Sequence, residues 1–137
     1  MQPHVDVEST IKLRLIEFSD TDAVPLSVSL RYSAADPYAV SAVFNCDGMA
    51  VEWVFARDLL RDGLSAPIGD GDVRVWPSWG IGRKLVMISL TSPDGQAVLE
   101  ANVKDVRDFL KRTIAVVPEG GETAHLDVDA ALARLFG

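Results

Sequence analysis

Three segments between residues 36 and 77 decide the predicted fold: Asp36-Pro37-Tyr38-Ala39-Val40, Val51-Glu52-Trp53-Val54-Phe55-Ala56-Arg57-Asp58-Leu59-Leu60 and Gly71-Asp72-Val73-Arg74-Val75-Trp76-Pro77. They predict two strands, a short helical turn after Trp53, and a third strand entered through a glycine-rich loop. Pro77 is expected to end that third strand, because proline cannot donate to a sheet ladder except at an edge. These segments specify structure and carry no recognisable chemistry.

The chain before the first helix alternates between apolar and polar residues, which is typical of strands with one buried face. Asp47-Gly48 predicts a tight hairpin between the last two of these strands, because both residue types tolerate positive φ. Trp53 falls on the apolar face of its strand and is expected in the core. A helix should follow and stop at Gly63. The four strands and the helix are expected at Val5–Leu15, Leu26–Tyr32, Tyr38–Asn45, Met49–Phe55 and Ala56–Asp62.

The second half of the chain repeats the pattern of strands followed by helices. Strands are predicted over 72–76, 83–91 and 96–103, with residues 78–82 as a flexible connection. From Lys104 the apolar period becomes 3.6, which indicates an amphipathic helix that Pro118 ends, and Asp127 can cap a second helix. The expected fold class is therefore α+β, with two antiparallel sheet halves of about seven strands, a short helix after the fourth strand, and two C-terminal helices.

Length and composition favour one domain over residues 1–137. No apolar run approaches the roughly 20 residues of a membrane-spanning helix, so no direct membrane insertion is expected. No secretory signal is visible and Cys46 is the only cysteine, both of which fit the cytoplasm. The net charge of −7 argues against a general nucleic-acid binder. Bases outnumber acids only in the middle segment, residues 64–118, where seven bases face six acids.

No residue pattern predicts a catalytic centre, a metal or a cofactor. His4 lies near the terminus and His125 in a polar loop, so a shared metal site is improbable. Cys46 has no neighbouring base to activate it and is expected to be a small packing residue. Three acid pairs lack the remainder of a calcium loop and are better explained as turns and helix caps: Asp20/Asp22, Asp70/Asp72 and Asp127/Asp129.

Two groups of residues are candidates for binding a partner. Trp76 and Arg74 share one face of their strand, and Trp79 lies in the glycine-containing connection after it. Exposed tryptophan beside arginine fits a protein interface or a base-stacking groove, and the acidic total favours protein. The second group is a basic row on the helix, Lys104, Arg107 and Lys111. A solvated helix face is the simpler explanation for this row, and docking of an acidic partner is the other.

With these residues in place, the chain resembles the SsgA-like family of actinomycete sporulation and cell division proteins. The resemblance extends from the first strand to the final helix. It is carried by Leu30-Arg31-Tyr32, Asp36-Pro37-Tyr38-Ala39-Val40, residues 53–60, residues 71–77, Ser92-Pro93-Asp94-Gly95 and Phe109-Leu110-Lys111-Arg112-Thr113.

The resemblance implies a protein that is not an enzyme. Family members help to select the division site, and some are associated with recruiting the tubulin-like protein FtsZ to future septa and promoting its assembly. The family fold is similar to that of the whirly-type single-stranded nucleic-acid binders and is expected as a homotrimer. The expected function is a cytoplasmic adaptor, concentrated at division septa, that binds FtsZ and other SsgA-like or divisome proteins and no nucleic acid. The alternative is a whirly-like module for single-stranded nucleic acid, because fold alone does not decide function.

Overall fold

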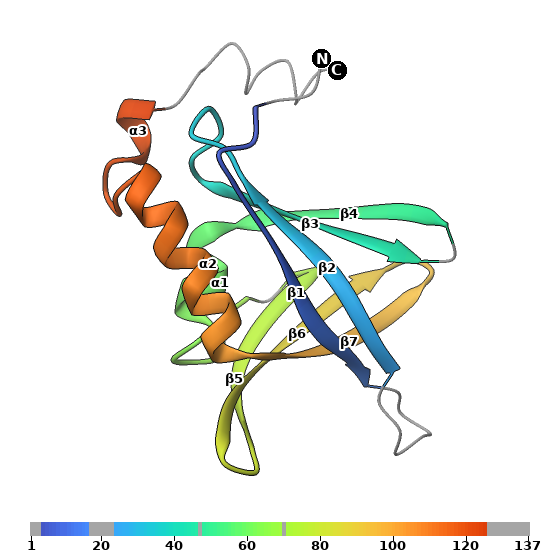
Figure 1. The fold of residues 1–137 in the computed structure, drawn as a ribbon. Helices are drawn as coiled ribbons and strands as arrows, with labels where there is room; N and C mark the ends of the chain where they lie inside the picture. The colour runs from blue at the N-terminus through green and yellow to red at the C-terminus, as the bar shows by residue number, and fades with distance from the viewer. Residues whose placement is uncertain (1–3, 17–23, 47, 70, 126–137) are drawn as a thin grey trace.

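A computed structural model of the chain describes residues 4–16, 24–46, 48–69 and 71–125. These residues form a curled antiparallel sheet with helices at one side (Figure 1). The elements are β1 (Val7–Ile16), β2 (Val24–Tyr32), β3 (Ala39–Cys46), β4 (Met49–Ala56), α1 (Arg57–Asp62), β5 (Val73–Gly80), β6 (Arg83–Ser92), β7 (Gly95–Asn102), α2 (Val103–Val116) and α3 (Glu122–His125). None of the helices within these ranges is long and apolar enough to cross a membrane.

The predicted α+β class is confirmed, and the two sheet halves are continuous. The described strands follow the order β4-β3-β2-β1-β7-β6-β5. The halves join where β1 pairs with β7, for example at Leu15 opposite Leu99. This contact links residues far apart in the sequence, so local alternation could not reveal it. The two predicted halves therefore form one curled sheet with a concave inner face, and they do not pack against each other as separate sheets.

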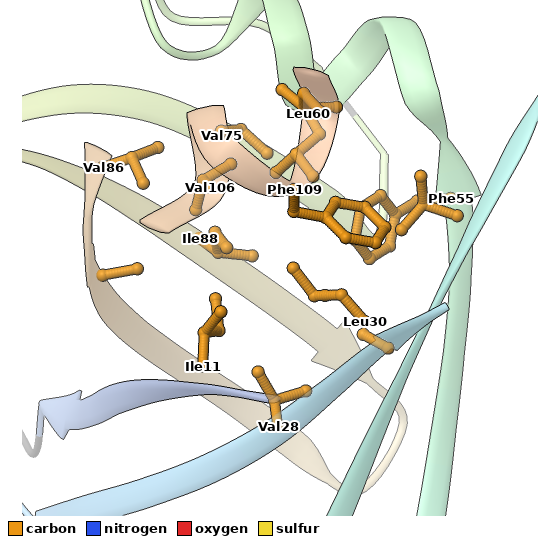
Figure 2. Close-up of a cluster of buried hydrophobic side chains, with 14 of the residues drawn as sticks. Ile11, Val28, Leu30, Phe55, Leu60, Val75, Val86, Ile88, Val106 and Phe109 are labelled. Atoms are coloured by element: carbon orange, nitrogen blue, oxygen red, sulfur yellow. The ribbon is translucent and has the colours of Figure 1, made fainter. Parts of the chain in front are cut away.

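The inner face carries the core because the predicted alternation holds through β1 and β2. Ile11 and Leu13 in β1 and Val28 and Leu30 in β2 are buried. Figure 2 shows Ile11, Val28 and Leu30 pointing into the same cluster as side chains from other strands. The polar residues between them lie on the outer face, so a one-residue shift in register would expose this entire set.

Helix α2 covers the inner face with its apolar stripe, as its 3.6-residue period predicts. Val106 and Phe109 are 0% and 1% exposed, and Leu110 is buried beside them. Figure 2 shows Val106 and Phe109 directed toward the strands. Lys104 and Arg107 lie on the opposite, exposed side of the helix. The helix is thus held by one face and presents the other to solvent.

Strand β5 continues through Pro77 to Gly80, so the expected end at Pro77 is wrong. β5 is an edge strand, and Val75 exchanges two backbone hydrogen bonds with Ile68 across its outer edge. Pro77 lies two residues further on, so its nitrogen points toward that same outer edge. It removes no hydrogen bond to β6. The expected flexible connection over 78–82 is correspondingly shortened to the turn at residues 81–82.

Two expectations for β3 and β4 need correction. Tyr38 was expected to begin the third strand but precedes β3 and is 46% exposed. Trp53 packs against the core but is only partly buried. Near the turn, Met49 is 70% exposed, because the hairpin extends past the core. Gly48 has φ of 80°, as the predicted tight turn requires, while Asp47 lies outside the described residues.

The segment after α2 begins as predicted and then differs. α2 ends at Val116, just before Pro118. His125, expected in a loop, belongs to the short helix α3. The helix that Asp127 was expected to cap lies outside the described residues.

Gly63 is expected to tolerate no side chain, because α1 packs closely on β5. A Cβ atom at Gly63 would lie 2.2 Å from Cγ1 of Val75, which is fully buried. Gly63→Ala should therefore lower the free energy of unfolding by about 1–3 kcal/mol, measured by urea denaturation. Gly71→Ala is the matched control, since nothing lies within 4 Å of its Cβ position. Equal stability of the two variants would show that α1 can move away from β5.

Candidate partner-binding site

An open groove lies on the outer face of the sheet beside β5. Its volume is about 620 Å³, and its lining includes Ile68, Arg74, Trp76, Ser89 and Gln96. Arg74 and Trp76 alternate with Val75, whose side chain is fully buried on the inner face. The groove therefore brings together the arginine and the tryptophan that the sequence places on one strand face.

The edge position of β5 explains why the groove forms. Ile68 pairs with Val75 across the outer edge of β5, and it therefore borders the groove along that strand. The groove also contains Ser89, which is 2% exposed and accepts a hydrogen bond of 2.8 Å from Nε2 of Gln96. Trp76 is partly exposed, so its ring presents an apolar surface to the groove. We define this surface by Ile68, Arg74, Trp76, Ser89 and Gln96 and call it the β5 groove.

Arg74 supplies the positive charge of the β5 groove. Its side chain is exposed and has no ion pair or hydrogen bond with another described residue. A guanidinium with free donors binds a carboxylate in a bidentate geometry. An acidic segment with an apolar side chain is therefore the kind of ligand that the β5 groove suits.

Trp79 is separated from the β5 groove. It lies three residues after Trp76 and therefore on the other face of β5, beyond the end of the core. Its side chain is 73% exposed, and Nζ of Lys84 lies 5.7 Å from the centroid of its ring. The structure thus places the two candidate tryptophans on different surfaces.

The basic row on α2 forms a third surface. Lys104, Arg107 and Lys111 are all exposed, as the helical period predicts. Nζ of Lys104 lies 2.9 Å from Oδ2 of Asp108, and this hydrogen bond raises the pKa of Lys104 and lowers the pKa of Asp108. The row is therefore partly neutralised by its own helix.

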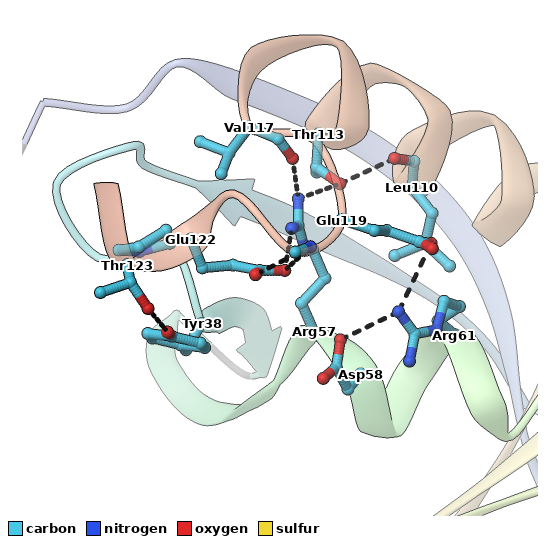
Figure 3. A network of polar contacts seen from close by, with 12 residues as sticks. Tyr38, Arg57, Asp58, Arg61, Leu110, Thr113, Val117, Glu119, Glu122 and Thr123 are labelled. Carbon is cyan, nitrogen blue, oxygen red and sulfur yellow. Dashed lines mark hydrogen bonds and ion pairs between the residues drawn. The ribbon is translucent and has the colours of Figure 1, made fainter. Parts of the chain in front are cut away.

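A buried arginine connects α1 with the C-terminal end of α2 and with α3 (Figure 3). Arg57 is 3% exposed, and its two terminal nitrogens reach the carbonyl oxygen of Val117 and Oε1 of Glu122, each at 2.8 Å. Its guanidinium also lies 5.0 Å from the ring centroid of Tyr32. These contacts tie α1 to the segment after α2. Sequence reasoning placed Arg57 on a short helix and gave no sign that it is buried.

The Arg57 network shifts the pKa values of its neighbours. Hydrogen bonds from the Glu122 backbone and from Arg57 hold the pKa of the Glu122 carboxyl below its usual range. Burial raises the pKa of Tyr32 to about 12, and nearby Arg57 opposes the rise. The Tyr32 hydroxyl donates to the carbonyl of Pro37 at 2.8 Å. No buried side-chain nitrogen or oxygen of the described residues lacks a partner, so the network is saturated and its role is structural.

Among the described side chains, the remaining chemical candidates form no cluster. Nε2 of His4 lies 3.1 Å from Oδ1 of Asp6, near the start of the described chain. Within the described ranges, no three His, Cys, Asp or Glu side chains are placed to hold a metal ion. For Cys46 and His125 the structure describes the backbone and not the side chain.

Sequence reasoning missed four residues of these surfaces. Ile68, Ser89 and Gln96 line the β5 groove, and Ile81 projects from the turn after β5 with its side chain fully exposed. Ile68, Ser89 and Gln96 gave no local signal, because their role depends on strand pairing between distant segments. Ile81 did give a local signal in the sequence. A large apolar residue between two glycines cannot pack on its neighbours and is unusual in a two-residue turn.

Known proteins are similar to this chain in sequence and in fold. The model of the family described as "Streptomyces sporulation and cell division protein, SsgA" matches residues 26–122. The sporulation-specific cell division protein SsgB of Kineococcus radiotolerans is 53% identical over 133 residues, covering 96% of this chain and 79% of that protein. SsgB of Streptomyces coelicolor is 49% identical over 131 residues, covering 95% of each. The crystal structure of an SsgA-like sporulation-specific cell division protein from Thermobifida fusca superposes with a TM-score of 0.83 at 43% identity, covering 93% of each chain.

Proposed function

The chain belongs to the SsgA family of sporulation and cell division proteins, and on that premise we propose that it is a non-enzymatic adaptor in sporulation-specific cell division. It helps to position FtsZ at septa or to promote FtsZ assembly there. The observation that supports this proposal is the β5 groove, an open surface that combines a partly exposed tryptophan with an arginine that pairs with no other described residue.

The β5 groove suits a protein partner for energetic reasons. Tryptophan and arginine are the residues that most often dominate interface energies, because each covers a large area and retains directional contacts. Trp76 offers a flat apolar surface, and Arg74 selects a carboxylate beside it. Gln96 adds a polar group at the rim. An acidic and partly apolar segment of FtsZ or of another divisome protein is the ligand we assign to it.

Self-assembly, with a trimer as the proposed state, is supported by the free edge of β4. β4 ends the strand order of the described sheet, and Met49, Val51 and Val54 are 70%, 42% and 47% exposed along it. An apolar edge strand is a template for pairing with another chain. Light scattering on the purified protein should give the mass of three chains, and the mass of a single chain would contradict the proposal.

Filament pelleting tests the adaptor function. Purified protein mixed with FtsZ and GTP should sediment with the polymers and increase their yield. Arg74→Glu should reduce the amount that sediments by about tenfold or more, because it places a like charge against an acidic ligand. Lys12→Glu, an exposed change on the outer face of β1, is the control for charge alone and should sediment normally. Absence of the wild type from the pellet, with unchanged polymer yield, would contradict direct recruitment.

Single-stranded nucleic acid is the second candidate ligand for the same groove. Arg74 beside Trp76 on a sheet face is an arrangement that can stack a base and hold a phosphate. The net charge of −7 weighs against it. A titration of labelled single-stranded DNA decides the matter, because a true binder loses affinity steeply as salt rises. We expect no salt-sensitive binding.

The site of action is proposed to be the cytoplasmic side of division septa. The names of the relatives, which are sporulation-specific cell division proteins, support the septal part of this proposal. A fluorescent fusion expressed during sporulation should concentrate in regularly spaced bands. A uniform signal throughout septation would contradict this proposal.

A further inference from the structure

The tip of the β5–β6 hairpin presents two large apolar side chains to solvent. Trp79 is 73% exposed, and Ile81 is 104% exposed, so Ile81 makes no protecting contact at all. Figure 1 shows this hairpin projecting beyond the rest of the sheet. We define the hairpin tip as residues 79–84. Apolar side chains in such a position contribute nothing to the core and are available to contact a partner.

The hairpin tip is held in this position by regular pairing. Gly80 pairs with Arg83, Trp79 pairs with Lys84, and a two-residue turn closes the hairpin. Gly82 in that turn has φ of 73°, which glycine adopts without strain. Leu85, immediately after the tip, is buried and anchors it. The tip is therefore a fixed projection of the fold.

The hairpin is also basic, although the protein as a whole is acidic. Residues 73–93 contain three bases, Arg74, Arg83 and Lys84, and no acid, although the whole chain has a net charge of −7. Two of these bases, Arg83 and Lys84, follow the exposed isoleucine within three residues, and Lys84 lies over the Trp79 ring. The end of the hairpin tip is thus apolar, and its positively charged side chains lie just behind that end.

We propose that the hairpin tip inserts shallowly into an anionic phospholipid surface. Tryptophan favours the depth of the headgroups, an isoleucine at the apex can reach the acyl region, and the adjacent Arg83 and Lys84 can bind lipid phosphates. A convex tip cannot enclose a peptide, whereas a fluid bilayer accepts a projection of any shape. This proposal differs from the expectation of no direct membrane insertion, which rested on the absence of a long apolar run. That criterion detects spanning helices and cannot detect a hairpin tip.

The expected contributions are large enough to measure. Each basic residue near an anionic surface strengthens partitioning by about fivefold, so Arg83 and Lys84 together contribute about thirtyfold. Burial of one exposed isoleucine contributes about tenfold or more. The acidic remainder of the chain weakens binding only where it lies within about 8–10 Å of the surface, because salt screens more distant charges.

Vesicle flotation with the purified full chain, without FtsZ, tests the proposal independently of the adaptor function. The protein should float with vesicles of equimolar phosphatidylcholine and phosphatidylglycerol and remain below phosphatidylcholine vesicles. Arg83→Gln with Lys84→Gln should weaken binding by about thirtyfold, and Ile81→Ser by about tenfold or more. Arg107→Gln with Lys111→Gln removes two exposed bases from α2 and should change binding by less than either tip variant.

Each contrary outcome has a definite meaning. Wild-type protein that does not float with the anionic vesicles overturns the proposal, as does flotation that the tip variants leave unchanged. A tip variant that lowers the oligomeric mass measured without lipid shows instead that the tip binds a second copy of the chain, which also overturns it. Unchanged melting temperatures in all variants confirm that the comparison is between folded proteins.

Discussion

Arg57→Ala is expected to lower the free energy of unfolding by about 3–5 kcal/mol, because it breaks a buried ion pair from one side. The Arg57 side chain is 3% exposed and donates to Glu122 and to the carbonyl of Val117. Its removal leaves these largely buried acceptors without a charged donor. Urea denaturation at neutral pH measures the loss, and the segment after α2 should lose protection from hydrogen exchange first.

Arg61→Ala is the matched control for Arg57→Ala. Arg61 lies four residues further along the same helix, its side chain is 36% exposed, and it pairs with Asp58 and Glu119 at the surface. Exposed pairs of this kind contribute about 0–1 kcal/mol. If both variants lost the same small amount, Arg57 would not be the buried anchor of the C-terminal segment.

The pH dependence of stability provides a separate check on the Arg57 network. The pKa of Glu122 lies below its ordinary value of 4.5 in the folded protein. The contribution of its carboxylate is therefore complete above that ordinary value and is lost as the pH falls through the lower folded value. Glu122→Gln should flatten the decline of stability in acid while lowering stability at neutral pH. An identical acid profile in wild type and Glu122→Gln would contradict the assigned pairing.

Phe109→Ala should have a comparable effect on stability, about 3–5 kcal/mol, through loss of packing. Phe109 is 1% exposed and lies at the centre of the α2 face that covers the curled sheet (Figure 2). Its removal leaves a cavity between α2 and the strands that rigid neighbours can fill only in part. Thermal and urea denaturation should both show the loss.

Lys111→Ala separates packing from helix propensity in the Phe109 experiment. Lys111 is exposed on the same helix, and both lysine and alanine are good helix formers. It should change stability by less than about 0.5 kcal/mol. A Phe109→Ala variant as stable as Lys111→Ala would mean that α2 does not cover the core as described.

The strands were predictable from sequence because their side chains alternate in a local pattern. Val28, Leu30 and Tyr32 are buried as their positions predict. The errors arose where position in the sheet overrode local chemistry. Pro77 is tolerated because β5 is an edge strand, and Tyr38 is exposed because its strand begins one residue later. Neither fact is encoded within a short window of sequence.

The residue types of the candidate surfaces could be predicted from sequence, but the positions of these residues in the fold could be predicted only in part. Arg74 and Trp76 share a face because they are two residues apart, which alternation alone predicts. Trp79 lies on the opposite face by the same rule, yet its position at a projecting tip depends on where the core ends. The burial of Arg57 depends on Glu122, which is 65 residues away in sequence. Such long-range pairing has no local signature.

Equilibrium binding of purified FtsZ to wild type and to Trp76→Ala tests most directly the central claim that this protein is an adaptor acting through the β5 groove. Val24→Ala, which alters an exposed apolar residue on β2, is the control. The account predicts binding about thirtyfold weaker for Trp76→Ala, as expected of a tryptophan at the centre of an interface, and unchanged binding for Val24→Ala. Equal affinity of all three folded proteins for FtsZ, or no measurable affinity of the wild type, would contradict it.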